Sequence, residues 1–197
     1  MTAHAVQHVL ALEPVIERAR SEASAGFECH PDGELFRLCI WGWFPPDWCG
    51  NLSLHCYAAR LSVVAAEARR VRTSLWAGTF LLAPSPHARR ARAQDFLHMA
   101  RHRPNGIAKP ASMEIDPLRI EQSPSVNATR IRIGGPDRIG FLAVVLDRMA
   151  FCGLYPHQLS VRTTQTGRAE DCFDVLGIGG TQPSPRALEA LEKLLRP

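Results

Sequence analysis

The residue types best suited to ligand chemistry lie in a short segment of the second half of the chain, just before a predicted helix. Asp137, Arg138, Ile139 and Gly140 follow one another, and an apolar run begins at Phe141. Asp137 can accept a hydrogen bond from the backbone N–H of Ile139 or Gly140 and so cap the helix. Gly140 has no Cβ, which lets a ligand approach the backbone. Because the N–H groups and the dipole at a helix start favour a carboxylate, the segment predicts a site for a small amino acid, whose ammonium group would need carbonyls or a carboxylate nearby.

A second interpretation of the same segment stays open. An aspartate and a glycine three positions apart before a helix can form only a cap and a tight turn, with Arg138 solvated. The residue pattern alone does not decide between a ligand site and a scaffold.

The spacing of apolar residues predicts the elements that position this segment. Ile131 and Ile133 alternate with arginines, which is the pattern of a half-buried strand. The apolar residues after Gly140 repeat at helical spacing, and Ser184-Pro185 is typical of a helix start. The predicted order in the second half is a strand at 118–122, a strand at 129–133, a helix at 141–152, strands at 158–164 and 171–178, and a helix from 185.

The first half repeats this order more weakly, which indicates duplication. It predicts a helix at 4–24, a strand at 35–44, a helix at 51–60, two strands within 62–83 and a helix at 87–101. The predicted class is α+β, with two ferredoxin-like domains, each a four-stranded antiparallel sheet with two helices on one face. The predicted organisation is an N-terminal helix at 1–25, a first domain at 26–103, a connector at 104–117 and a second domain at 118–197.

Three separated motifs follow one another in the second half. In chain order they are Asp137-Arg138-Ile139-Gly140-Phe141-Leu142, Gly153-Leu154, and Arg168-Ala169-Glu170-Asp171-Cys172-Phe173-Asp174-Val175. Together they resemble the ACT family. The resemblance covers about 118–195 and is greatest to the C-terminal ACT pair of bifunctional uridylyltransferase/uridylyl-removing enzymes and to the two-ACT regulators of glycine cleavage.

The resemblance implies a ligand site at the interface between two ACT units. It assigns ligand contacts to the whole first motif, Asp137, Arg138, Ile139, Gly140, Phe141 and Leu142. In the first half, Asp47-Trp48-Cys49-Gly50-Asn51-Leu52 keeps the aspartate and glycine of that motif, so Asp47, Gly50 and Asn51 are the weaker candidates there. The aspartate before the later phenylalanine is missing from Trp76-Ala77-Gly78-Thr79-Phe80-Leu81, and the first unit is therefore degenerate.

The function implied by the resemblance is allosteric regulation by a small amino acid, in nitrogen metabolism. Glutamine or glycine is the implied ligand, a regulatory protein is the implied partner, and the units are expected to pair within the chain or in a homodimer. Two alternatives stay open, a ligand-free interaction or dimerisation module and a transcriptional co-regulator. DNA affinity that falls steeply with salt would favour the co-regulator.

Composition and charge narrow the other classes of function. The net charge is +4, and the arginines are scattered rather than gathered on one stripe, so nucleic acid is not expected as a partner. The chain has six cysteines without C-x-x-C spacing, no apolar stretch of membrane-spanning length, and a poor match to a signal peptide at its start. A cytoplasmic location with reduced thiols and no membrane contact is the expectation.

No set of residues predicts catalysis, a metal or a cofactor. His4/His8 and His98/His102 have the i,i+4 spacing of zinc-binding pairs, but neither pair has an adjacent glutamate or an evident third ligand. His157 has no predicted nucleophile beside it. The chain is therefore expected not to be an enzyme.

Overall fold

The described part of the molecule has an α+β fold built on one sheet. The computed structural model describes residues 10–88, 94–106 and 113–196. Within them the elements are α1 (Glu13–Ser21), β1 (Gly26–Asp32), β2 (Leu35–Trp43), α2 (Trp48–Ala58), β3 (Leu61–Arg72), β4 (Leu75–Pro84), α3 (Phe96–Arg101), β5 (Leu118–Gln122), β6 (Thr129–Pro136), α4 (Phe141–Phe151), β7 (Tyr155–Thr163), β8 (Arg168–Leu176), a 3₁₀ turn (Ile178–Gly180) and α5 (Pro185–Leu195).

The strands form a continuous eight-stranded antiparallel sheet in the described residues. Its order is β1-β2-β4-β3-β7-β8-β6-β5, so β3 and β7 join the first half of the chain to the second. At this seam Ala66 pairs with Val161, Glu67 with Ser160 and Ala68 with Leu159. The expected side-by-side pairing of the two halves therefore occurs within one chain.

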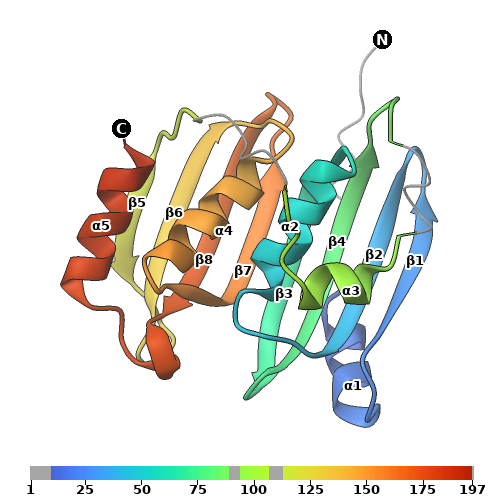
Figure 1. The fold of residues 1–197 in the computed structure, drawn as a ribbon, viewed down its shortest axis with the longest axis horizontal. Coiled ribbons are helices and arrows are strands. Elements are labelled where there is room, and N and C mark those ends of the chain that lie inside the picture. Colours follow the sequence, from blue (N-terminus) through green and yellow to red (C-terminus); the bar gives the residue numbers. More distant parts are fainter. Residues whose placement is uncertain (1–9, 89–93, 107–112, 197) are drawn as a thin grey trace.

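Helices cover the sheet unequally. Helices α2, α3, α4 and α5 lie on one face, whereas α1 packs on the other (Figure 1). Side chains alternate between the faces along a strand. Accordingly Ile40 belongs to the core beneath α2, and its neighbour Trp41 packs with Ile16 of α1.

The two halves repeat with a constant spacing. The first residues of α2 and α4, Trp48 and Phe141, lie 93 positions apart. The seam partners Glu67 and Ser160 are separated by the same interval, so the halves are related by an approximate two-fold axis through this pair. The α+β class and the repeated element order agree with the sequence prediction, while the domain limits at 26–103 and 118–197 remain predictions.

Three local predictions need correction or extension. The first helix begins at Glu13 with Pro14 in its first turn, and residues 10–12 are not helical; proline suits only a helix start because it lacks an N–H. Of the described residues in the helix predicted at 87–101, only Phe96–Arg101 are helical, and the Asp95 side chain accepts a hydrogen bond from the His98 N–H there. Residues 89–93 of that prediction, and residues 4–9 of the first predicted helix, lie outside the described part. Strand β1 was not predicted.

The predicted start of the last helix is confirmed. The Ser184 side chain accepts a hydrogen bond from the Ala187 N–H, and Pro185 opens α5. None of the helices within the described ranges is long and apolar enough to cross a membrane.

Candidate functional site

The predicted motif forms the loop between β6 and α4, and its first aspartate is held by another strand. The Asp137 carboxylate accepts a hydrogen bond from the Thr163 hydroxyl of β7, 2.5 Å away, and its N–H donates to the Gly167 carbonyl. The expected capping role of Asp137 is wrong. The N-cap of α4 is Gly140, which has a left-handed backbone (φ 94°) and no side chain to form a cap.

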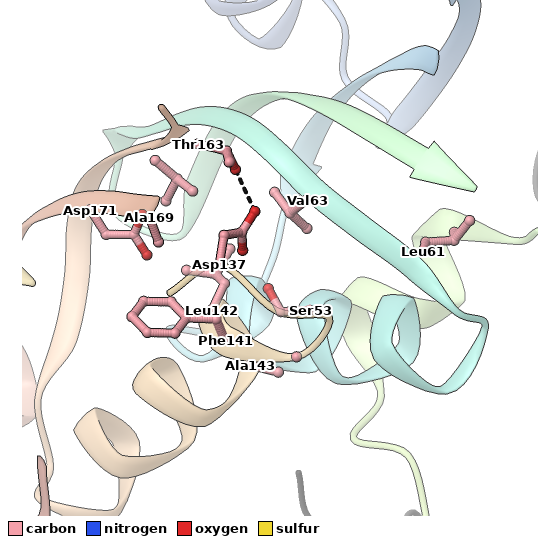
Figure 2. A pocket seen from close by; sticks show the side chains of 12 residues that line it. Ser53, Leu61, Val63, Asp137, Phe141, Leu142, Ala143, Thr163, Ala169 and Asp171 are labelled. Atoms are coloured by element: carbon pink, nitrogen blue, oxygen red, sulfur yellow. Dashed lines mark hydrogen bonds between the residues drawn. The ribbon is translucent and has the colours of Figure 1, made fainter. Parts of the chain in front are cut away.

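The loop lines a small cavity at the meeting point of the two halves. Asp137, Gly140, Phe141 and Leu142 line it from the second half (Figure 2). The cavity measures about 20 Å³, roughly the space of one water molecule. The remaining lining residues are Ser53 of α2, Leu61 and Val63 of β3, Ala143 of α4, Val161 and Thr163 of β7, and Ala169 and Asp171 of β8.

The other two members of the predicted motif do not line this cavity. Arg138 and Ile139 are exposed, and Ile139 retains 39% of its accessible surface. The structure thus brings four of the six second-half candidates together and leaves two on the loop exterior.

Asp171 is the most unusual group in the cavity. It is 3% exposed, and neither of its carboxylate oxygens has a hydrogen-bond partner within the described residues. Burial raises the pKa of this carboxyl well above its usual range, and the nearby charge of Asp137 raises it further. The Arg162 backbone N–H, which lies near the carboxylate but outside hydrogen-bond geometry, has a smaller opposing effect. The acid is therefore favoured in its neutral form.

Ser53 adds a second unpartnered group from the opposite half. Its hydroxyl oxygen is buried and has no hydrogen-bond partner in the described residues. Buried polar groups are normally paired, so two such groups around one cavity indicate room for a polar guest. Sequence reasoning quoted Asp171 only as part of a motif and missed Ser53, because no local pattern relates α2 to the loop before α4.

The first-half candidates lie elsewhere. Asp47 is the N-cap residue of α2, without a side-chain capping bond, and Gly50 and Asn51 lie inside the first turns of that helix. The repeat of 93 positions matches Asp47 to Gly140, not to Asp137. The sequence alignment of the first motif was therefore displaced by three residues.

Aromatic side chains occupy the space that corresponds to this cavity in the first half. Phe44 stands at the position of Asp137, and its ring stacks on Trp48 with centroids 5.1 Å apart. Gly78 stands at the position of Asp171, and a Cβ there would come within 2.9 Å of Trp48. Aromatic packing in this half therefore takes the place of the polar groups that line the cavity in the second half.

Within the described ranges, histidines and other metal-binding residue types do not assemble into a metal site. No group of three or more His, Cys, Asp or Glu side chains in the described ranges is placed to hold a metal ion. His98 and His102 lie together, with ring centroids 4.6 Å apart. His4 and His8 fall outside the described residues.

Comparisons with known proteins give little beyond this geometry. No protein-family model matches the chain, and no curated protein matches it. A solved structure, that of aspartate kinase from Synechocystis, aligns over 83% of this chain with 14% sequence identity and a TM-score of 0.48. The chain spans 27% of the length of that protein.

Proposed function

We propose that this protein is a regulatory module that binds a small amino acid in the cavity between its two halves. The observation that carries the proposal is the pair of buried, unpartnered polar groups, Asp171 and Ser53, at one cavity lined also by Asp137. Leaving such groups unsatisfied costs about 1–3 kcal/mol each. A ligand that satisfies them would recover part of that free energy.

Both charged ends of an amino acid have a complement here. The ammonium group would lie between Asp137 and Asp171, and its positive charge would favour ionisation of the buried acid. The carboxylate would approach the first turn of α4, where unpaired N–H groups and the helix dipole favour a negative charge. Gly140 gives that approach room because it has no side chain.

The cavity is so small that binding of an amino acid would require a change in structure, and this change could couple binding to regulation. A space for about one water does not hold an amino acid, so the ligand must widen the gap between α2 and the 137–140 loop. Because α2 and the loop belong to different halves, the ligand would stabilise a different arrangement of the halves. A partner protein that distinguishes the two arrangements would then be coupled to the ligand.

The proposal also includes the identity of the ligand, the assembly of the protein and its location. The resemblance to ACT domains favours glutamine or glycine as the ligand, and the protein would act as a non-enzymatic regulator, as a homodimer or with a partner protein in the cytoplasm.

A thermal-shift screen against the twenty amino acids tests the proposal. At a hundredfold excess over the dissociation constant, a ligand that binds only the native protein adds about 2.7 kcal/mol. For a chain of this size the Tm should rise by about 5–10 °C. The rise should be strongly reduced in Asp171→Asn and unchanged in Glu170→Gln, the adjacent exposed carboxylate that pairs with Arg162. A flat screen at millimolar concentrations would contradict amino-acid sensing.

A second candidate, a protein interaction module, has one observation in its favour. Phe151 at the end of α4 is 82% exposed, and it lines a groove of about 430 Å³ with Leu194 of α5. Large exposed apolar side chains are enriched at protein interfaces. If the amino-acid screen is flat and Phe151→Ser abolishes self-association in analytical ultracentrifugation, the interaction module would become the better-supported function.

A further inference from the structure

A second, larger cavity lies at the opposite end of the β3–β7 seam and shares no lining residue with the first. It measures about 810 Å³, within the range of small-molecule sites. It lies where the β3–β4 hairpin meets the start of β7 and the turn after β8. Its lining consists of Pro46, residues 70–74, Trp76, residues 155–157 and residues 176–180.

The charge of this cavity is positive. Arg70 and Arg72 of β3 and His157 of β7 line it, and no aspartate or glutamate is among its described lining residues. In the part of the chain that the structure describes, neither arginine has a hydrogen-bond or ion-pair partner. Guanidinium groups without a counter-ion around one cavity favour an anionic guest.

Two buried nitrogen atoms at the same cavity also lack partners. The indole Nε1 of Trp76 and the Nε2 of His157 are buried without a hydrogen bond in the described residues. Trp76 itself is 4% exposed. An indole N–H can only donate, so the group that satisfies it must be an acceptor such as a carboxylate or phosphate oxygen.

We infer that this cavity binds a small oxyanion ligand, carrying phosphate or paired carboxylate groups, through Arg70, Arg72, His157 and Trp76. The two guanidinium groups neutralise the charge, and Trp76 and His157 donate to further oxygens. Tyr155 and Ile178 provide an apolar rim for the uncharged part of the ligand. The inference does not depend on the amino-acid site, because the two cavities have separate linings.

The surroundings of His157 provide a residue-specific signal of binding. Burial lowers the pKa of its imidazole, and the positive charge of Arg70 lowers it further, whereas Asp174 opposes both effects. Asp174 is already engaged by Arg130 through two hydrogen bonds of 2.8 Å. An oxyanion beside His157 would favour the imidazolium form and move its titration to higher pH.

Calorimetric titration of the full chain at constant ionic strength tests the inference. The probes are inorganic phosphate, pyrophosphate and succinate, each compared with chloride. Binding of phosphate or pyrophosphate without succinate would identify a phosphate-bearing ligand, and the reverse preference would identify a dicarboxylate. Either result supports the inference, and no binding of any probe overturns it.

Matched variants distinguish binding at this specific cavity from a general electrostatic attraction of anions to a basic protein. Arg72→Gln should weaken binding about tenfold or more, because this exposed arginine would contact the anion directly. Arg162→Gln removes the same charge at the far end of β7 and should leave the affinity unchanged. Equal losses in both variants, or a His157 titration by NMR that does not respond to the anion, would overturn the inference.

Discussion

The behaviour of individual carboxylates in β8 depends on their neighbours and not on burial alone. Asp171 and Asp174 are both buried in this strand. Burial would raise the pKa of Asp174, but the hydrogen bonds from Arg130 and Ser123, together with the positive charges of Arg130 and His157, outweigh it and lower that pKa. Asp171 has no such partner, so its pKa rises. Asp174 therefore stabilises the native state as a charge, whereas Asp171 is tolerated there as a neutral acid.

This contrast predicts opposite pH dependences for two variants. In wild type the native state keeps the proton of Asp171 at pH values where the unfolded chain has released it. The free energy of unfolding therefore falls as pH rises above about 4, by up to about 1.4 kcal/mol per pH unit from this group. Asp171→Asn has no proton to release, so its stability relative to wild type should increase from pH 4 to pH 8 in urea unfolding. A pH-independent difference would contradict the assignment.

Asp174→Asn serves as the control of opposite sign. The lowered pKa of Asp174 contributes stability that is present above the unfolded pKa of about 3.9 and is lost as pH falls through the native value. This variant should therefore be less stable than wild type at neutral pH, and the difference should shrink on acidification toward pH 3.

At the scale of elements, the repeat of 93 positions shows which side chains of the first half stand where the second half has its cavity. Both halves have a four-residue connection before the helix, but Phe44 replaces Asp137 and an aromatic cluster fills the corresponding space. Because the repeat matches Asp47, and not Gly50, to the helix-capping Gly140, Gly50 lies within α2. Its hypothetical Cβ would lie 3.6 Å from the Cβ of Leu146 in α4, an ordinary contact distance.

Gly50→Ala should therefore stabilise the protein. Glycine inside a helix is less favourable than alanine by about 0.5–1 kcal/mol, and no close contact opposes the added methyl group. Thermal or urea unfolding should reveal an increase of about this size. Gly78→Ala is the contrasting change, since its Cβ would meet Trp48 and Phe80 at 2.9 Å, and it should destabilise the protein. Loss of stability in Gly50→Ala would mean that Gly50 does not have the helical environment described here.

At the scale of the whole molecule, the seam makes one folding unit of two repeated halves. Ala66 and Ala68 are fully buried at the β3–β7 pairing, and α2 packs against α4 above it. Separation of the halves would expose the unpaired edges of two strands together with the apolar faces of two helices, which is unfavourable in water.

We therefore expect a single cooperative unfolding transition for the chain. Tryptophan fluorescence reports on the first half, because the four tryptophans lie at positions 41, 43, 48 and 76. Far-UV circular dichroism reports on both halves, and the two signals should coincide in urea. Leu146→Ala at the α2–α4 contact should lower stability by about 2–5 kcal/mol without separating the two transitions. Two separate transitions in wild type would show that the halves fold independently.

Local sequence patterns were sufficient to predict most helices and strands of the second half. The alternation at Ile131 and Ile133, the helical spacing after Gly140 and the cap at Ser184 are short-range signals, and the structure agrees with each of them. The α+β class and the position of the 137–140 loop before a helix follow from these signals, because period and capping act within a few residues.

Contacts between distant segments required the three-dimensional structure. The pairing of β3 with β7, the hydrogen bond from Thr163 to Asp137 and the cavity that Ser53 and Asp171 both line bring together residues 26 to 118 positions apart. Burial, and with it the pKa of Asp171 and the positive cavity around Arg70, arises only when these segments pack together. No residue pattern of helical or strand period encodes such neighbours, because hydrogen bonding and exclusion of water across the seam depend on the packing of the whole chain.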